Sequence, residues 1–315
     1  MRKLFVLVAV GLLLMMTDAL AAPKVVVTIK PIHSLVAGVM QGVGIPELLL
    51  QGAASPHGYS LRPSDVRSLS RADLIVWVGR DLETFMLKPL AAHGRRARVL
   101  TLLDTPGMKL LPARTGGGWE SEAHHHHGHG DGHHHHAKAD AGEAMDAHLW
   151  LSPANAATIV RRVAAELAEL HPQSAAAYRA NEQRLLRRIQ QLEKELALQL
   201  KPVQGVPYLV FHDAYQYFEE TFGLNAVGSI TVDPERRPGA RRLREIRTKV
   251  RELGVAAVFA EPQFEPRLVA TVVEGSKARV GLLDPLGADL PPGEEAWFQL
   301  MRHMADNLRG TLVSR

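Results

Sequence analysis

The stretch Gln173–Lys201, QSAAAYRANEQRLLRRIQQLEKELALQLK, decides how this chain is organised. It holds no glycine or proline, while Pro172 precedes it and Pro202 follows it. Its large apolar residues recur at spacings of seven, four, three and four, which places them along one side of a helix. They are Tyr178, Leu185, Ile189, Leu192 and Leu196. We predict a helical strut about 44 Å long over residues 173–201, with a surface helix of one domain or a coiled coil as the alternatives.

Apolar runs typical of buried strands lie on both sides of this helix. Those before it are Val25–Ile29, Asp73–Val78 and Arg98–Leu102. Those after it are Tyr208–Phe211, Val255–Ala260 and Val280–Leu283. Polar or helical stretches separate the runs, and such alternation indicates βα units with mostly parallel sheets. We therefore expect an α/β fold of two βα sandwich lobes joined by one long rigid helix, with an N-terminal lobe over residues 22–172 and a C-terminal lobe over residues 202–315.

The composition is that of an ordinary globular protein, because 46% of the 315 residues are apolar and 22% are charged. The formal net charge is +4, and it falls to +3 without the first 21 residues, which carry Arg2, Lys3 and Asp18. This small excess is spread along the chain and does not indicate nucleic-acid binding. The chain has no cysteine, which excludes disulfides, thiolate metal sites, cysteine nucleophiles and a lipid-bearing N-terminal cysteine.

The first residues indicate export. Met1-Arg2-Lys3 is a basic start, residues 4–16 are apolar and uncharged, and Ala19-Leu20-Ala21 is a small-x-small cleavage site. A membrane anchor is the weaker interpretation, because the apolar run is shorter than the roughly 20 residues that a spanning helix needs. We expect residues 1–21 to be a cleavable signal peptide and the mature protein to diffuse freely in a bacterial periplasm.

Residues 112–146 form a low-complexity stretch rich in Gly, His, Asp and Glu. Nine of the 16 histidines of the chain lie in it: His124, His125, His126, His127, His129, His133, His134, His135 and His136. Such a stretch buries too little apolar surface to offset the cost of ordering, so we expect a mobile loop. Neutral imidazole binds first-row metals, and the nine histidines therefore predict auxiliary, weak metal binding. An expression tag is the alternative, which the internal position and broken pattern disfavour.

Three other histidines lie where a ligand could reach them. His57 stands in a turn just before a helix start, His148 precedes a second helix start, and His212 follows the strand Tyr208–Phe211. The carboxyl ends of strands are where open α/β sheets bind ligands. One such histidine is more often structural than a ligand, but three of them on a chain with a histidine-rich loop favour a shared site.

The remaining four histidines serve as a comparison. His93, His171 and His303 lie in polar or helical contexts, and we expect them to be ordinary surface residues. His33 directly follows the first predicted strand, so its role stays open.

Four motifs carry a resemblance to one family. They are SPHGYSLRPSD at 55–65, HLWLSP at 148–153, FHDAY at 211–215 and FAEPQF at 259–264. In this order they are similar to the periplasmic zinc-binding components (ZnuA type) of bacterial ABC zinc importers, and the similarity extends over essentially the whole mature chain. The resemblance implies two βα lobes joined by one long helix, with a single zinc ion held in the cleft between them.

The resemblance also implies that His57, His148 and His212 are the zinc ligands, and that Zn(II) is the transported ligand rather than a catalytic cofactor. The implied partner is an ABC-type zinc permease in the inner membrane, with its cytoplasmic ATPase. The chain would act in the periplasm as a monomer, without enzymatic activity and without nucleic acid.

Two features depart from the pattern of this family. Some relatives carry a glutamate just before the first histidine, where this chain has Pro56, and some have a disulfide that this chain cannot form. The fourth position on the metal is therefore open. Asp284, in LLDPLG at 282–287, matches a carboxylate ligand of manganese-binding and some zinc-binding cousins, and it is our candidate as a direct or water-mediated ligand. Glu261 is expected to support a ligand or the fold.

Three imidazoles favour zinc, which prefers four-coordinate tetrahedral sites with nitrogen donors at about 2.0–2.1 Å, whereas manganese favours oxygen. A secreted zinc hydrolase is the main alternative, because three protein ligands and a water also describe a catalytic zinc. The chain has neither a His-Glu-x-x-His nor a Gly-x-Ser-x-Gly motif, although Asp213 could be proposed as a base. A periplasmic zinc buffer or chaperone is the third reading, for which two lobes and a cleft would not be needed.

Overall fold

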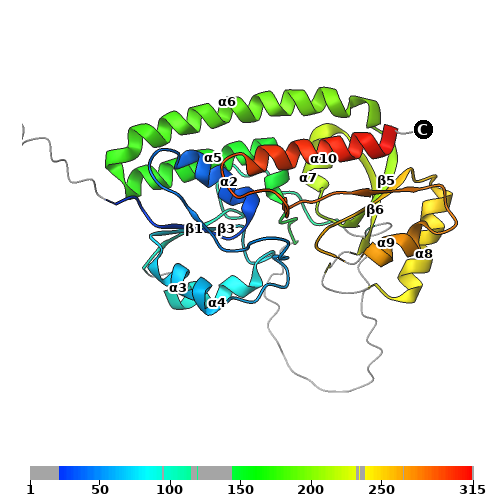
Figure 1. Cartoon of the computed structure of the whole chain (residues 1–315), viewed down its shortest axis with the longest axis horizontal. Coiled ribbons are helices and arrows are strands. Elements are labelled where there is room, and N and C mark those ends of the chain that lie inside the picture. Colours follow the sequence, from blue (N-terminus) through cyan, green and yellow to red (C-terminus); the bar gives the residue numbers. More distant parts are fainter. Residues whose placement is uncertain are drawn as a thin grey trace, which may run out of the picture.

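The computed structural model describes residues 21–93, 96–114, 119, 144–231, 234, 238–264 and 266–313. Residues 1–20 of the expected signal peptide and the histidine-rich segment 124–136 lie outside these ranges. The described residues form two lobes beneath one long helix, α6 (Figure 1). Within these ranges, no helix combines the length and the hydropathy that a membrane-spanning segment requires.

Each lobe contains a four-stranded parallel sheet. The N-terminal sheet has the order β2-β1-β3-β4, and its strands are β1 (Val25–Val27), β2 (Glu47–Leu48), β3 (Leu74–Trp77) and β4 (Arg98–Thr101). The C-terminal sheet has the order β6-β5-β7-β8, and its strands are β5 (Pro207–His212), β6 (Asn225–Thr231), β7 (Ala257–Ala260) and β8 (Arg279–Leu282). The two lobes thus repeat one strand order, and the predicted α/β fold with two parallel sheets is confirmed.

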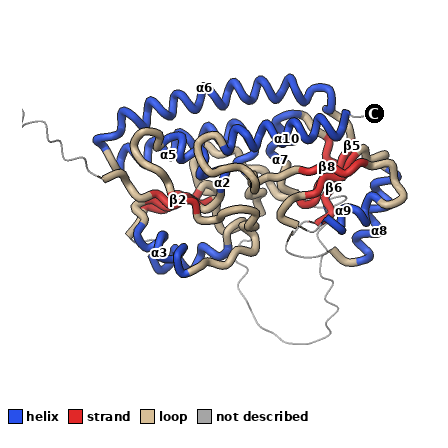
Figure 2. The backbone as a smooth tube through the Cα atoms, viewed as in Figure 1, coloured by secondary structure: helices blue, strands red, loops and turns tan. Residues whose placement is uncertain are grey.

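Helices cover both faces of each sheet (Figures 1 and 2). In the N-terminal lobe they are α2 (Lys30–Val39), α3 (Pro63–Arg71), α4 (Leu87–His93) and α5 (Pro153–Leu170). In the C-terminal lobe they are α7 (Gln216–Phe222), α8 (Ala240–Glu252), α9 (Pro266–Val273) and α10 (Ala296–Val313). Helices α3 and α8 lie on the side of the molecule away from α6, so each sheet is the middle layer of a sandwich.

The long helix α6 (Ala175–Leu200) continues into short 3-10 turns at Pro172–Ser174 and Lys201–Val203. Its predicted apolar stripe is buried throughout and packs against α2, α5 and α10. Gly38 of α2 permits the close approach, because a Cβ there would lie 2.9 Å from the Leu185 side chain. The helix therefore belongs to the core of both lobes, and the predicted long connecting helix is confirmed.

Strand β5 positions the C-terminal half of the site through the alternation of its side chains. Tyr208 and Val210 belong to the core that continues into the N-terminal lobe, whereas Leu209 and Phe211 belong to a separate core beneath α8 and α9. His212 continues the even-numbered series at the carboxyl end of the strand. The alternation therefore directs its ring toward the N-terminal lobe.

The chain crosses between the lobes a second time after β8. Lys30 of α2 donates to the carbonyl oxygens of Gly287 and Ala288 at 2.6 and 2.7 Å. The indole of Trp150 donates to Pro285 O, and that of Trp297 donates to Trp150 O, each at 2.8 Å. Since Trp150 and Trp297 are both fully buried, the lobes share a packed interface on this side and are not joined by α6 alone.

Two strands were not predicted from the sequence. Strand β2 has only two residues, too few to show a periodicity, and β6 begins with Asn225 and contains Gly228, so it resembles a loop in sequence. The two ends of the expected loop 112–146 are also more regular than predicted, because Pro112 and Met145 form an antiparallel bridge.

Candidate metal centre

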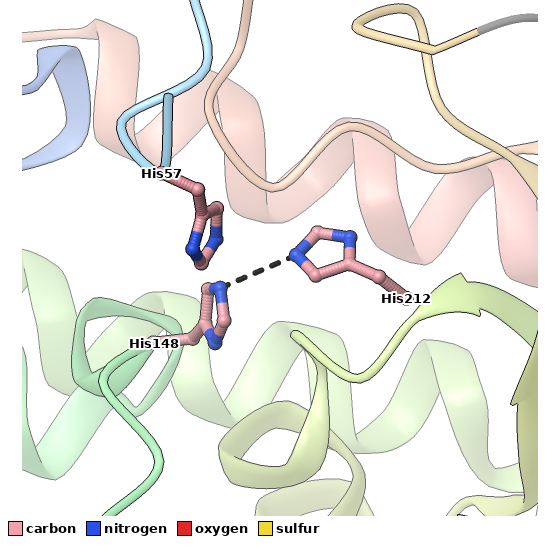
Figure 3. A group of neighbouring side chains, drawn as sticks. All are labelled: His57, His148 and His212. Atoms are coloured by element: carbon pink, nitrogen blue, oxygen red, sulfur yellow. Dashed lines mark hydrogen bonds between the residues drawn. The ribbon is translucent and has the colours of Figure 1, made fainter. Parts of the chain in front are cut away.

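The structure brings His57, His148 and His212 together between the lobes (Figure 3). One ring nitrogen of each lies within 4.8 Å of the corresponding atoms of the other two. The ring centroids are 5.6 Å apart for the two pairs that include His57 and 5.1 Å apart for His148 and His212. Histidines from three separate parts of the sequence, in both lobes, thus face one point.

His148 is held by the segment that leads into α5. It directly precedes the 3-10 turn Leu149–Leu151, whose three side chains are fully buried. Ser152 caps α5 by accepting a hydrogen bond from the backbone N–H of Asn155 at 3.2 Å, as its position before Pro153 predicts. The turn after His148 is therefore buried, and the helix that follows the turn is capped, which fixes the backbone at His148.

His57 lies in the loop between β2 and α3. Its backbone N–H donates to Ser55 Oγ at 3.3 Å, and Asp65 fixes the far end of the loop by accepting from Arg62 N and Tyr59 Oη at 2.7 and 2.8 Å. Among the described residues, no group forms a hydrogen bond with the ring nitrogens of His57. Packing and the loop backbone alone therefore hold this ring.

The other two histidines each contact a buried carboxylate. Nδ1 of His148 lies 2.8 Å from Asp146 Oδ1, and Nδ1 of His212 lies 2.7 Å from Glu261 Oε1. The parallel register of β5 and β7 pairs Tyr208 with Ala257 and, continued along both strands, places Glu261 beside His212. A carboxylate accepts a proton only from Nδ1–H, so both rings are fixed in the tautomer that leaves the Nε2 lone pair free.

The two free Nε2 atoms face each other at 3.3 Å, along the dashed line in Figure 3. Two lone pairs at this distance repel unless a proton or a cation lies between them. Two nitrogens bound at tetrahedral angles to one zinc ion, each at about 2.05 Å, would be separated by about 3.3 Å. The spacing of His148 and His212 thus matches a tetrahedral zinc site without rearrangement.

Comparison with known proteins places the chain among metal-uptake components. A model of the family described as "Zinc-uptake complex component A periplasmic" matches residues 25–311. The chain belongs to this family. It is 48% identical over 304 residues to the high-affinity zinc uptake system protein ZnuA of Brucella abortus (strain 2308), with 91% of each chain covered. The corresponding protein of Yersinia pestis is 39% identical, with 95% of this chain and 94% of the relative covered.

Solved structures of this architecture share the fold at lower identity. A crystal structure of ZnuA has a TM-score of 0.75 and 24% identity, and covers 92% of this chain and 99% of its own. A Pseudomonas aeruginosa protein described in complex with Mn2+ has a TM-score of 0.76 and 20% identity, and covers 92% of this chain and 98% of its own. At these identities the likeness shows that the fold is shared.

Protonation differs among the histidines of this family member. Burial, together with charge on His148 and His212, lowers the pKa of His57 to about 2. Burial also opposes protonation of His212, but the Glu261 carboxylate, together with Asp213 and Asp146, outweighs it and raises the pKa of that ring. His57 is therefore a neutral imidazole throughout the physiological range, while a proton competes with a metal at His212.

Asp284 lies in the C-terminal lobe after β8, outside the cluster of three histidines that the described residues form. Its Oδ1 accepts from Gln263 Nε2 at 2.8 Å and from Leu286 N at 2.9 Å, and its Oδ2 accepts from Ala288 N at 2.5 Å. The carboxylate thus stabilises the turn that leads back to the N-terminal lobe. Its assignment as a fourth ligand stays a prediction.

A second charged cluster adjoins the site. The Arg114 guanidinium binds Asp213, the residue after His212, and also Glu219 of α7. Burial raises the pKa of the Asp213 carboxyl, and Arg114 partly offsets this effect, while burial raises the pKa of Glu219 to about 7. Sequence patterns did not identify Arg114, because nothing in its neighbourhood marks it as a partner of a residue 99 positions away.

Three further histidines whose side chains the structure describes, His33, His171 and His303, lie outside the cluster. His33 is buried, and its Nε2 lies 2.9 Å from Pro46 O, so it is a core residue. The expectation that His171 lies on the surface is wrong, since only 8% of it is exposed. His303 is exposed as expected, and the side chain of His93 lies outside the described part of the structure.

Proposed function

We propose that this protein captures one Zn2+ ion in the cleft between its lobes and delivers it to an ABC permease for import. In this proposal His57, His148 and His212 are the ligands. The observation that carries it is the pair of Nε2 atoms at 3.3 Å, each on a ring whose Nδ1 is engaged by a carboxylate. That arrangement fits tetrahedral coordination by nitrogen, which zinc prefers.

Capture requires little reorganisation of the protein. His148 and His212 are fixed in the tautomer that binds metal, and the low pKa of His57 keeps the third imidazole neutral. Asp146 and Glu261 supply two negative charges behind the rings, which together match the charge of a divalent ion. Water or Asp284 fills the fourth coordination position of the zinc ion, and Asp284 contacts the ion either directly or through a water molecule.

Delivery rests on the relatives and on the sequence. The curated relatives are named zinc uptake proteins, and the start of the chain has the features of an export signal. We propose a periplasmic protein that docks as a monomer on an inner-membrane permease, which a cytoplasmic ATPase drives. The histidine-rich segment 124–136 would gather zinc weakly before the cleft binds it tightly.

Zinc titration in competition with a chelator tests the proposal. The exported chain should show one tight site, and alanine at His57, His148 or His212 should weaken it by orders of magnitude, since each change removes one of three protein ligands. His303→Ala is the matched control, because this exposed histidine lies on α10 and outside the cluster. Tight zinc binding that survives all three substitutions would refute the proposed site.

Cellular zinc import provides the second test. A strain that lacks this protein should grow poorly when zinc is chelated, and the wild-type gene should restore growth while a His148→Ala gene should not. A zinc hydrolase would instead show metal-dependent turnover of an ester or peptide substrate, independent of any permease. Growth that does not depend on the permease would favour a zinc buffer.

A further inference from the structure

Arg114 joins the N-terminal lobe to the residue that follows His212. Its Nε donates to both carboxylate oxygens of Asp213 at 3.0 Å, and its Nη1 donates to Glu219 Oε2 at 2.6 Å. The guanidinium also stacks on Trp119, 3.5 Å from the ring centroid. Only 19% of the Arg114 side chain is exposed, against 10% for Asp213 and 5% for Glu219, so this is a largely buried ion cluster.

Asp213 depends on this arginine for its charge balance. Among the described residues, Arg114 is the only donor of a hydrogen bond to the Asp213 side chain, and it occupies both carboxylate oxygens. A buried carboxylate without a partner carries a large desolvation penalty and is driven to protonate or to find another cation. Asp213 directly follows His212 in the chain, and its carboxylate lies outside the cluster of three histidines. A metal held by the neighbouring ring of His212 would then be an alternative cation for this carboxylate.

The donor set then decides which metal is favoured. Imidazole nitrogen suits zinc, whereas carboxylate oxygen suits manganese. Since a protein described in complex with Mn2+ shares this fold, the architecture alone does not choose. An additional carboxylate beside His212 would shift a nitrogen site toward the preference of manganese.

We propose that Arg114 is a positioning residue that sets metal specificity: it keeps the Asp213 carboxylate from joining the three histidine nitrogens as a ligand, which favours Zn2+ over Mn2+. The inference rests on the proposed function, because it takes the three histidines as ligands. It assigns Arg114 a part in metal selection that is separate from any collection of zinc by the histidine-rich segment 124–136.

Arg114→Met in the exported chain tests the inference. Dissociation constants for Zn2+ and Mn2+ are measured by chelator competition, and the affinity for Mn2+ relative to Zn2+ should rise at least about tenfold, the range in which groups behind metal ligands act. Co2+ provides a spectroscopic readout: its intense four-coordinate visible absorption should weaken as an oxygen ligand joins. Arg188→Met is the matched control, because Arg188 also pairs with a carboxylate, Glu295, at 2.7 Å and stacks on an aromatic ring, Phe298, at 4.0 Å.

Second-site variants identify the carboxylate responsible. Arg114→Met with Asp213→Asn should restore the wild-type metal ratio and Co2+ spectrum, whereas Arg114→Met with Glu219→Gln should not. An unchanged ratio and spectrum in Arg114→Met, or a change that Asp213→Asn does not reverse, would overturn the inference. If Arg114→Met does not fold, Arg114→Lys keeps the charge but loses the two-point contact; its ratio should rise to a smaller extent, and an unchanged ratio again contradicts the inference.

The wild-type protein separates this inference from the proposed function. If the wild-type chain has no tight zinc site and no four-coordinate Co2+ spectrum, the proposed function fails. If the wild-type chain has both and the Arg114 variants have the same metal ratio and Co2+ spectrum, the proposed function stands and the role of Arg114 is refuted.

Discussion

Glu261→Gln tests whether the carboxylates behind the histidines contribute to zinc affinity. Glu261 Oε1 accepts from His212 Nδ1 at 2.7 Å and from the backbone N–H of the same residue at 3.2 Å. Only 3% of Glu261 is exposed, so water screens its charge little. Glutamine has nearly the same shape and can still accept the Nδ1–H, which makes the substitution a removal of charge rather than of volume.

The magnitude follows from the geometry. The 2.7 Å hydrogen bond, the imidazole ring and a Zn–N bond of about 2.1 Å place the carboxylate about 6.5 Å from the metal. A single negative charge and a divalent cation at this separation attract by about 5 kcal/mol at an effective dielectric constant of 20. This value is a ceiling, because the glutamine carbonyl dipole retains part of the attraction. We expect zinc affinity to fall 10–100-fold, or about 1.4–2.7 kcal/mol.

Chelator competition at pH 7.5 gives the zinc dissociation constant for this comparison. Glu83→Gln is the matched control: Glu83 is fully buried in the N-terminal lobe, accepts from Val78 N and Gly79 N at 2.7 and 3.0 Å, and has its pKa raised by burial to about 7. Its substitution should leave zinc affinity unchanged. A Glu261→Gln protein that binds zinc as tightly as the wild type would refute the reasoning.

Four further outcomes are expected. Because the pKa of His57 is about 2, zinc binding at pH 6 should release fewer than three protons. Zinc affinity should still decrease as the pH is lowered, because His212 becomes protonated. Calorimetry in buffers of different ionisation enthalpy measures the number of protons released, and a value near three would contradict the pKa order. Deleting His124–His136 should leave one tight zinc per protein and abolish the weak sites in a calorimetric titration, so loss of the tight site would exclude a merely auxiliary role. Asp284→Asn should weaken zinc binding about tenfold if the carboxylate reaches the metal. An unchanged dissociation constant would show that Asp284 stabilises the turn after β8 and does not contribute to zinc binding. Trp150→Phe, which removes the bond to Pro285 O, should lower the free energy of unfolding by about 1–3 kcal/mol in urea, and no loss would show that the lobe interface is relaxed there.

Local periodicity was sufficient to predict most of the fold. The stripe on α6 and the apolar runs around it predicted the long helix and six of the eight described strands, because burial imposes a spacing that the sequence must match. The packing of the lobes against each other was not predictable in this way. Lys30 donates to Gly287 O, and Trp297 donates to Trp150 O. These hydrogen bonds join residues far apart in sequence, and no local pattern indicates which partner each residue will meet.

The candidate site was predictable to the extent that its residues have distinctive chemistry. Histidine is a common metal ligand and stands out at the end of a strand or before a helix, so His57, His148 and His212 could be named from the sequence as candidates. Asp146 could not, since it lies in a stretch rich in acids and its contact with His148 depends on the turn between them. Glu261 was noted only through the resemblance; its place beside His212 follows from the register of two parallel strands, which sequence does not give.

The three histidines are held unequally, and this difference bears on the proposed capture and release of zinc. His148 and His212 have carboxylates at Nδ1 and belong to buried, packed elements, so their Nε2 atoms keep a fixed separation. His57 has no hydrogen-bond partner for its ring among the described residues and lies on a loop rather than on a helix or strand. The shared core and α6 oppose separation of the lobes. In the proposed zinc site, His148 and His212 set the spacing of two ligands, and His57 is the ligand whose ring has no hydrogen-bond partner among the described residues.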